Sequence, residues 1–321
     1  MRAAVVSDSG DDAAFSLLER PDPRCGPDDA VMRITAAGVN RADILQRRGL
    51  YPPPPGAPEW PGLEAAGTVA EVGAAVTGWR PGDRACALLP GGGYAERVAV
   101  DASLLLPVPA GVTDVEAASL VEAACTVVSN LDAAGARAGE TLLVHGGSGG
   151  VGTAAIQIAK ARGMRVIATA GGAARAGRCA ALGADHALDH RAGGWVDEVR
   201  ALGGADVILD VVGAAYLADN VRALRTGGRL VVIGLQKGAR AELDLGALLT
   251  KRATLLGTTL RARPLAERAA IVARVRGEVW PLVPRIVRPV VHATFPLAHA
   301  GDAHAALESG EVFGKVVLTV P

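Results

Sequence analysis

A run from Gly146 to Gly152 in the middle of the chain is the pattern with the clearest chemical meaning. It holds five glycines in seven positions and satisfies both Gly-x-x-Gly-x-x-Gly and Gly-x-Gly-x-x-Gly. The apolar stretch Thr141–Val144 precedes it, and a predicted helix follows from Thr153. In a strand–turn–helix context, glycines allow a tight turn and let backbone N–H groups approach a pyrophosphate at the positive end of a helix. The run therefore predicts a dinucleotide site.

The end of the next predicted strand indicates which dinucleotide would bind. A site for NAD usually places an Asp or Glu about 20 residues beyond the glycines, where it binds both ribose hydroxyls. Here the strand ends in Thr169–Gly172 without a carboxylate, and Arg175 follows. A carboxylate would repel the 2′-phosphate of NADP, whereas a guanidinium can pair with it. The sequence favours NADP, and the alternative for Arg175 is a solvated helix residue in an arginine-rich chain.

The elements that would position these residues begin at about residue 115, where apolar strands alternate with helices. Short, continuous β-branched runs spaced by helices favour a parallel sheet that is covered on both faces. The predicted strands are Leu142–Val144, Arg165–Thr169, Asp206–Leu209, Arg229–Ile233 and Ala253–Leu256. The predicted helices are Thr153–Arg162, Ala174–Leu182, Tyr216–Leu224 and Asp244–Lys251.

The first third of the chain is predicted to be a compact antiparallel β domain. Thr68–Val72 alternates apolar and polar residues, Pro81–Arg84 has turn composition, and Tyr94–Val100 is typical of a strand. Between them, four prolines in the loop Tyr51–Gly56 set an extended and fairly rigid path.

The last part of the chain departs from both patterns and is expected to pack back onto the first domain. A charged helix is predicted near Pro264–Arg276, followed by strands at Ile286–Val291 and Lys315–Val320. Five arginines form a basic stretch here, which is more typical of a solvated helix face than of a nucleic-acid patch. They are Arg261, Arg263, Arg268, Arg274 and Arg276.

The composition is compatible with an enzyme and argues against a nucleic-acid-binding or membrane protein. Lys+Arg and Asp+Glu both number 33 in 321 residues, so the net charge gives no electrostatic footprint for nucleic acid or an anionic membrane. The segment after Met1 has no apolar core of a signal peptide, and the uncharged run Thr141–Ala159 is too rich in glycine to suggest a bilayer span. We expect a cytoplasmic protein without membrane insertion or a nucleic-acid partner.

The cysteines and histidines do not suggest a metal site. Cys25, Cys86, Cys125 and Cys179 lie far apart without a Cys-x-x-Cys pair, and most are expected to be small buried hydrophobic residues. His145, at the end of a strand, is expected to be buried and hydrogen-bonded. The other histidines are expected mostly on loops and helix surfaces: His186, His292, His299 and His304.

Six segments that span almost the whole chain carry a resemblance to a known family. They are Ala37–Asp43, Arg48–Pro54, Gly62–Gly67, Pro81–Asp83, His145–Thr153 and Gly314–Val317. On these segments the chain resembles the quinone oxidoreductase branch of the medium-chain dehydrogenase/reductase family, the ζ-crystallin-like group. The resemblance implies an α/β fold with a GroES-like β domain plus a Rossmann domain with a doubly wound parallel sheet. The implied limits are 1–120 for the substrate domain, 121–260 for the NADP-binding domain and 261–321 for a returning segment.

The resemblance also bears on the metal and on the substrate. Zinc-dependent alcohol dehydrogenases, which are distant relatives, use Cys where this chain has Asn40 and His where it has Leu63. Neither Asn nor Leu is a plausible zinc ligand, so no metal is expected. Without a Lewis acid, the preferred acceptors are already electron-poor, such as quinones and conjugated enones. No second dinucleotide fold is visible for a flavin, so reducing equivalents would pass directly from the nicotinamide to the substrate.

The resemblance carries residue roles over to this chain, with the cofactor in the cleft between the domains. Asn40 and Thr126 match positions near the nicotinamide. Gly150 and Val151 match the pyrophosphate site, with Gly149 before them in place of a serine that some relatives use near the nicotinamide. Gly172, Arg175 and His190 match the adenosine phosphate end, where relatives often have a tyrosine at the position of His190. The remaining cofactor positions are Gly213, Gly234, Leu235, Phe313 and Lys315.

Tyr51 and Asn40 are the predicted catalytic residues. Tyr51 matches a family tyrosine that lines the cleft, and its phenol could donate a hydrogen bond to a quinone oxygen as negative charge develops. The alternative is a tyrosine that caps the proline loop. Asn40 is expected to bond substrate or ribose, with a simple turn residue as the alternative. Asp43 either holds the Asn40 loop or is a surface acid on a helix.

These observations predict an NADPH-dependent, zinc-independent oxidoreductase that reduces a quinone. Reduction of the carbon–carbon double bond of a 2-alkenal or enone is the alternative, because the same hydride and cleft would serve both. A structural or RNA-binding protein recruited from this fold is a further alternative. The β-rich stretch Ala253–Thr258 is expected at a sheet edge, which predicts a homodimer through that edge strand.

Overall fold

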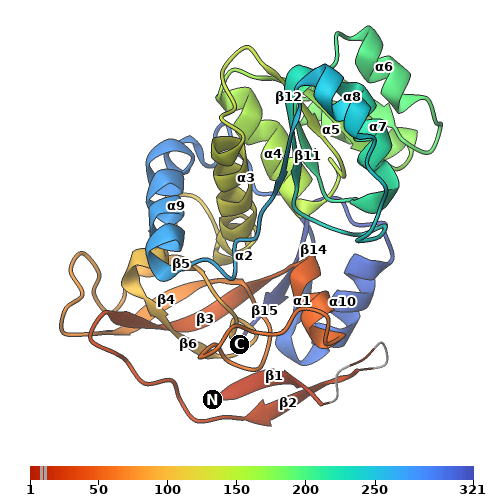
Figure 1. The fold of residues 1–321 in the computed structure, drawn as a ribbon. Coiled ribbons are helices and arrows are strands. Elements are labelled where there is room, and N and C mark those ends of the chain that lie inside the picture. The colour runs from red at the N-terminus through yellow and green to blue at the C-terminus, as the bar shows by residue number, and fades with distance from the viewer. Residues whose placement is uncertain (8–9, 11–12) are drawn as a thin grey trace. The chain divides into compact units, whose positions relative to one another are not determined.

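The computed structural model describes residues 1–7, 10 and 13–321, and the chain forms two compact units (Figure 1). The first unit contains Met1–Cys125 together with Leu260–Pro321, and the second contains Thr126–Thr259. The chain passes from the first unit into the second within α3 (Val121–Ala133) and returns after β13 (Thr254–Gly257).

A mostly antiparallel sheet is the framework of the first unit. Its strand order is β14 (Val291–Pro296), β15 (Lys315–Thr319), β3 (Asp29–Val39), β4 (Glu64–Val72), β5 (Arg84–Leu88) and β7 (Leu105–Pro107), with β6 (Arg97–Asp101) also paired to β3. β1 (Arg2–Val6) and β2 (Phe15–Glu19) form a separate antiparallel pair. The helices are α1 (Arg41–Arg47), α2 (Asp114–Ala118), α9 (Leu265–Glu278) and α10 (Ala300–Glu308).

The register of β15 against β3 matters for the site. The two strands are antiparallel, with Val316 opposite Val39 and Val317 opposite Gly38. Lys315 and Asn40 are the next residues in this register, so two residues that are 275 positions apart in sequence lie side by side.

The strand predicted at Ile286–Val291 is wrong. β14 begins only at Val291, and residues 284–290 form a turn and an irregular segment. Pro284 and Pro289 explain the difference, because proline has no N–H group to donate to a neighbouring strand. The strand predicted at Lys315–Val320 is confirmed as β15, and the helix predicted near Pro264–Arg276 as α9.

The second unit is built on a parallel sheet of six strands, so the doubly wound parallel sheet is confirmed (Figure 1). The strand order is β10 (His186–Asp189), β9 (Arg165–Ala170), β8 (Thr141–Val144), β11 (Ala205–Asp210), β12 (Leu224–Val232) and β13. In sequence order this is the 3-2-1-4-5-6 arrangement of Rossmann domains. The helices are α4 (Gly150–Ala161), α5 (Ala173–Ala181), α6 (Trp195–Ala201), α7 (Leu217–Ala223) and α8 (Leu245–Lys251).

Two elements of this unit were not predicted, and the starts of β12 and α4 differ from the prediction. β12 begins at Leu224, five residues before the predicted Arg229. β10 has four residues and α6 has seven, which is too short for a clear hydrophobic period. The helix expected from Thr153 begins three residues earlier, at Gly150. The last glycines of the run therefore belong to the helix and not to the turn before it.

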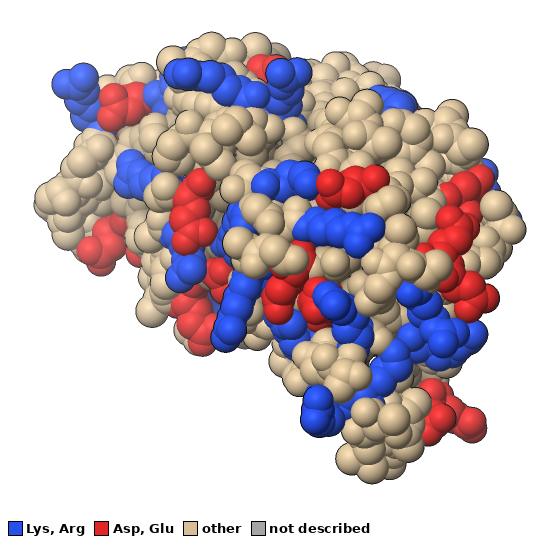
Figure 2. Space-filling view, turned by 90° about the horizontal axis from the view of Figure 1, so that it is seen from above, with Lys and Arg blue, Asp and Glu red and all other residues tan. Residues whose placement is uncertain are grey.

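Charged side chains of both signs are interspersed over much of the face shown in Figure 2. Among the residues that the structure describes, no helix is long and apolar enough to cross a membrane. The cysteines follow the expected pattern, since Cys86, Cys125 and Cys179 are buried and Cys25 is half-buried.

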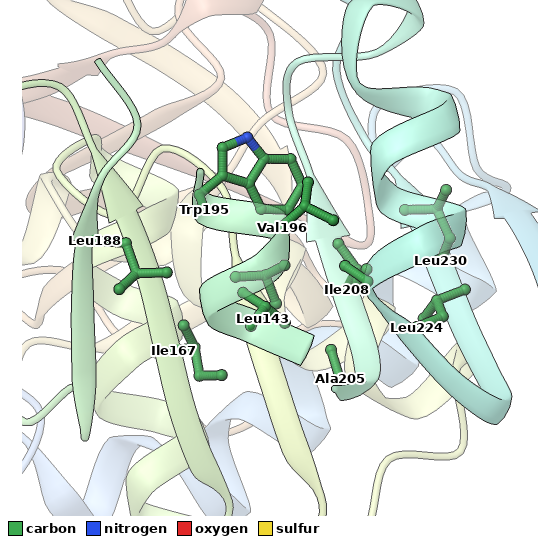
Figure 3. Packing of buried hydrophobic residues seen from close by; sticks show 11 residues of the cluster. Leu143, Ile167, Leu188, Trp195, Val196, Ala205, Ile208, Leu224 and Leu230 are labelled. Carbon is green, nitrogen blue, oxygen red and sulfur yellow. The ribbon is translucent and has the colours of Figure 1, made fainter. Parts of the chain in front are cut away.

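The core of the second unit fixes α6 and α7 against one face of the sheet (Figure 3). Five strands and two helices supply apolar side chains to one cluster, with Trp195 of α6 over it. Burial of such side chains stabilises by about 1.5–3 kcal/mol each. The cluster consists of Leu143, Ile167, Leu188, Trp195, Val196, Val199, Ala205, Ile208, Ala223, Leu224 and Leu230.

Candidate functional site

The glycine run connects β8 to α4, as the sequence predicts. Gly149 is the N-cap residue, and Gly150 and Val151 are the first two residues of the helix. Backbone N–H groups in the first turn of a helix have no partner within the helix. They point toward the positive end of the helix dipole, where an anion is stabilised. Gly150 and Val151 can therefore bind a pyrophosphate through their amides.

Gly152 lets the helix approach the turn closely. A Cβ at this position would lie 2.1 Å from the carbonyl oxygen of Gly146 and 2.6 Å from the Cα of Gly147. These are backbone atoms that cannot move aside without displacing the turn. A residue with a side chain at position 152 would push the start of α4 away from the loop.

Basic side chains gather where β9 and β10 end. The Nε of Arg175 donates to the carbonyl oxygen of Gly171 at 2.7 Å. A Cβ built on Gly171 would lie 3.1 Å from the Nε of Arg191 and 3.2 Å from the Nε2 of His190. The structure thus brings Arg175 and His190 together and adds Arg191, which the sequence analysis did not single out. Arg175 comes from α5, His190 and Arg191 follow β10, and the segment between β9 and α5, Gly171 and Gly172, has no carboxylate of its own.

The neighbouring Asp189 is held by backbone amides. Its Oδ1 accepts from Gly172 N at 2.8 Å and from Arg191 N at 2.9 Å. These hydrogen bonds lower the pKa of the Asp189 carboxyl. The carboxylate therefore braces the turn after β9 against the end of β10.

The His190 ring favours its neutral form. Partial burial lowers its pKa, and the charge of Lys237 adds to this effect. Pairing of a protonated His190 with a phosphate is thus disfavoured, whereas stacking by a neutral ring fits its half-buried position.

The loops after β11 and β12 bring Gly213, Gly234 and Leu235 together. A Cβ on Gly213 would lie 3.1 Å from the Cα of Leu235, and one on Gly234 would lie 2.8 Å from the carbonyl oxygen of Val211. Asp210, at the end of β11, accepts from Gly213 N at 3.1 Å. These residues, like the glycine run and Arg175, follow the carboxyl ends of parallel strands, where ligands bind in such sheets.

A buried polar chain runs beneath these loops. The Nδ1 of His145 is 2.9 Å from Thr169 Oγ1, and its Nε2 is 2.7 Å from Asn220 Oδ1. Asn220 in turn donates to Asp210 Oδ2 at 3.1 Å. Burial lowers the pKa of His145 to about 4, so the ring is neutral at neutral pH. His145 is thus the buried, hydrogen-bonded residue that the sequence predicts.

In the first unit, Asn40 and Lys315 meet at Glu64. The Nζ of Lys315 lies 2.6 Å from Glu64 Oε1 and 2.6 Å from Asn40 Oδ1. Asn40 Nδ2 donates to the same Glu64 oxygen at 3.0 Å, and Glu122 N donates to the other oxygen at 2.9 Å. Glu64 is fully buried. We call Asn40, Glu64 and Lys315 the amide–ammonium cluster.

Gly38 makes room for this cluster. A Cβ on Gly38 would lie 2.3 Å from Glu64 Oε1 and 2.4 Å from the carbonyl oxygen of Ala118. Only a residue without a side chain lets the Glu64 carboxylate lie against β3 at this point.

Asp43 holds the Asn40 loop and is not a surface acid. It is fully buried and accepts from Asn40 N at 2.8 Å and Gly62 N at 2.9 Å. Burial raises its pKa to about 6, against these two hydrogen bonds. Tyr94 donates to Asp43 at 3.3 Å, and the Nε2 of His304 is 3.0 Å from the Tyr94 oxygen.

The expectation of a surface position for His304 is wrong. Its ring is fully buried beside Tyr94 and Phe15, because α10 packs its inner face on the first unit's core. Burial lowers its pKa to about 3. His292 and His299 are exposed, as expected, and His186 is half-buried.

Tyr51 is partly buried under Arg261. The guanidinium carbon lies 5.4 Å from the centre of the Tyr51 ring, and Nη1 donates to the Tyr51 carbonyl oxygen at 3.3 Å. Arg261 also donates to Pro90 O at 2.6 Å and to Gln46 Oε1 at 2.8 Å. The expectation of a solvated Arg261 is therefore wrong, because its side chain is buried and donates to three acceptors. Arg274 and Arg276 are exposed, and Arg263 and Arg268 are half-buried.

Two further predicted cofactor residues are buried. Thr126 lies in α3, where its carbonyl oxygen accepts from Ser129 and Asn130. Phe313 precedes β15, and its N–H donates to His292 Nδ1 at 3.4 Å. Across the described ranges, no group of three or more His, Cys, Asp or Glu side chains is arranged to hold a metal ion.

Comparison with known proteins agrees with both units. Residues 26–110 match the model of the alcohol dehydrogenase GroES-like domain, and residues 150–274 match that of the zinc-binding dehydrogenase. The chain is 32% identical over 332 residues to the quinone oxidoreductase of Lama guanicoe, covering 99% of this chain and 97% of that protein. The chain belongs to the quinone oxidoreductase branch of the medium-chain dehydrogenase/reductase family. It is thus an oxidoreductase of that type.

Solved and longer relatives of this family member complete the comparison. The quinone oxidoreductase of Thermus thermophilus, solved alone and with NADPH, is 35% identical, with a TM-score of 0.84 and coverage of 99% and 100%. A mycocerosic acid synthase-like polyketide synthase of Mycobacterium tuberculosis is 34% identical over 316 residues. The match covers 96% of this chain but 15% of that protein.

Several residues of the site escaped the sequence analysis of this family member. Glu64 stands in the matching segment Gly62–Gly67, but only the fold shows that its carboxylate is buried against Lys315. Arg191 directly follows His190, and this adjacency is the one signal that could have indicated it. Asp210 and Asn220 lie ten residues apart and carry no motif that predicts their contact.

Proposed function

We propose that this chain is an NADPH-dependent, zinc-independent oxidoreductase that passes reducing equivalents directly to a quinone. The observation that carries the proposal is the group of Arg175, His190 and Arg191 at the ends of β9 and β10, beside a loop without a carboxylate of its own. A guanidinium pairs well with the 2′-phosphate that distinguishes NADPH from NADH. The NADPH complex of the Thermus thermophilus relative supports this cofactor.

Each group of residues has a role in this proposal. The amides of Gly150 and Val151 bind the pyrophosphate, and Gly213, Gly234 and Leu235 line the remainder of the nucleotide site. NADPH, when bound, supplies the hydride. Tyr51 donates a hydrogen bond to the acceptor oxygen. Burial raises the pKa of the Tyr51 phenol, so the hydroxyl keeps its proton at neutral pH and can donate.

The cofactor proposal is tested by titrating the purified protein with NADPH and NADH separately at equal ionic strength. Arg175→Ala should weaken NADPH binding by roughly 1–3 kcal/mol, as loss of a charge-assisted hydrogen bond does, and leave NADH binding unchanged. Arg178→Ala, on the same helix, is the matched control and should change neither. Equal losses for both nucleotides, or tighter binding of NADH by the wild type, would contradict the proposal.

The acceptor is tested by turnover with 1,4-benzoquinone and with a 2-alkenal. We expect NADPH oxidation with the quinone and a reduced kcat for Tyr51→Phe. Turnover of the alkenal alone would replace the quinone by the carbon–carbon double bond of an enal or enone. If neither nucleotide binds, the structural or RNA-binding alternative becomes the one to pursue.

We also propose a homodimer in the cytoplasm. β13 lies at the edge of the parallel sheet, which leaves one side open to pairing with a second copy. The four cysteines are free thiols, as is usual in a reducing compartment. Cell fractionation that finds the protein outside the cytoplasm would refute the location.

A further inference from the structure

The amide–ammonium cluster has one orientation because of its charges. The Asn40 oxygen faces the Lys315 ammonium, and its NH₂ group faces the Glu64 carboxylate. The reverse orientation would place NH₂ against the ammonium and oxygen against the carboxylate, which are both repulsive. Glu64 itself is fixed by Glu122 N and by the close approach to Gly38.

The cluster has more N–H donors than its own acceptors use. An amide has two N–H donors and an ammonium has three. One N–H group of Asn40 donates to Glu64. Two N–H groups of Lys315 are used, one by Glu64 and one by the Asn40 oxygen. In the part of the chain that the structure describes, these two nitrogen atoms have no further partner. One N–H group on Asn40 Nδ2 and one on Lys315 Nζ are therefore available. Both residues are buried: Asn40 is 9% exposed and Lys315 is 5% exposed.

The free N–H groups of Asn40 and Lys315 are buried and need a hydrogen-bond acceptor. Leaving a buried polar group without a hydrogen bond is unfavourable, and a donor on a cation is the strongest kind. Asn40 Nδ2 and Lys315 Nζ both donate to the same oxygen, Glu64 Oε1, at 3.0 Å and 2.6 Å. The two nitrogen atoms are therefore neighbours, and their remaining N–H groups can meet at one acceptor atom. An oxygen that is neutral or gains negative charge fits this site, whereas a cation would be repelled by Lys315.

We propose that Glu64 is a positioning residue that holds Lys315 and Asn40 so that both donate to one oxygen atom of a bound molecule. This inference rests on the proposed function. The oxygen belongs either to the cofactor or to the acceptor. In the second case the acceptor gains the hydride and its two electrons, its oxygen takes the negative charge, and a proton from solvent then neutralises it. Fixed N–H donors at such an oxygen stabilise the transition state.

The test compares three proteins with the wild type. Glu64→Gln with Lys315→Met removes both charges together, so no unpaired charge is left in the core. Lys315→Arg keeps the ion pair but moves its donors. Arg47→Met with Glu308→Gln neutralises another partly buried ion pair of the first unit and is the control, expected to behave as wild type. Thermal unfolding and circular dichroism establish that each variant is folded.

The readouts are NADPH Kd and, at saturating NADPH, kcat and KM for the quinone. A fall in kcat on the order of 10²-fold with unchanged Kd supports the proposal and assigns the oxygen to the acceptor. A raised Kd with unchanged kcat supports it and assigns the oxygen to the cofactor. Unchanged Kd, kcat and KM in the double variant overturns it. If that variant does not fold, Lys315→Arg decides: the same losses support the proposal, and wild-type behaviour overturns it.

The wild type separates this inference from the proposed function. If the wild type binds NADPH but reduces no acceptor, the quinone proposal fails and the cluster is judged on Kd alone. If the wild type binds no NADPH, both proposals fail together.

Discussion

His145 carries one proton, and its neighbours determine which nitrogen holds it. Asn220 donates through Nδ2 to Asp210, so its oxygen faces the Nε2 of His145. Nε2 must therefore be the protonated nitrogen, and Nδ1 accepts from the Thr169 hydroxyl. Two aromatic rings, Trp195 and Tyr216, cover the imidazole edge to face and exclude water.

The first prediction is that His145 stays neutral until about pH 4. Its folded pKa lies below that of an unfolded histidine, 6.5, so its stabilising contribution is present above pH 6.5. It is lost as the pH falls through about 4, and the free energy of unfolding should drop by roughly 3 kcal/mol over that interval. Long-range ¹⁵N NMR of the ring checks this, with Nε2 protonated; a midpoint near 6.5 would contradict it.

The loop between β8 and α4 is the element whose geometry is most tightly constrained. Gly152 lies in the first turn of α4, against the carbonyl oxygen of Gly146. The amides proposed to bind the pyrophosphate stand one and two residues before it. Their position therefore depends on a contact between two stretches of backbone.

The second prediction is that Gly152→Ala weakens NADPH binding. The added methyl group would meet Gly146 O at 2.1 Å, which forces the start of α4 outward. We expect the Kd to rise by about tenfold or more, or 1.4 kcal/mol, by isothermal titration. Gly177→Ala in α5 is the control: a Cβ there meets nothing within 4 Å, so binding should be unchanged and stability equal or slightly higher. Equal affinity of the two variants would refute the role of Gly152.

At the scale of the whole molecule, the second unit has an open sheet edge and several exposed leucines. Leu245 and Leu249 lie on the same side of α8, and they are 63% and 76% exposed. Leu255 in the edge strand β13 is 42% exposed. An open edge strand and exposed apolar side chains each favour association, and the proposed dimer would cover Leu255.

The third prediction is that the protein is a dimer and that Leu255→Glu dissociates it. A charge at the edge strand opposes burial against the same charge of a second copy. Size-exclusion chromatography with light scattering should give twice the chain mass of 32.5 kDa for the wild type and one mass for the variant. Leu18→Glu, on exposed β2 of the other unit, should remain dimeric. A monomeric wild type would reject the dimer.

Structural features that depend only on residues close together in the sequence could be predicted from it. The glycine run, the carboxylate-free end of β9 and the alternation of strands with helices each depend on neighbours within one strand–helix unit. They were enough to predict the parallel sheet, and the proposal that Arg175 pairs with a phosphate rests on them.

Burial and pairing across the chain were decided only by the tertiary structure. His304, Arg261 and Glu64 look like surface residues by type, yet each is buried by partners far away in sequence. Lys315 lies beside Asn40 only because β15 pairs with β3 in one register, and a shift by one residue would turn its side chain to the other face. The environment of a charged side chain is set by such pairings, which no local sequence pattern records.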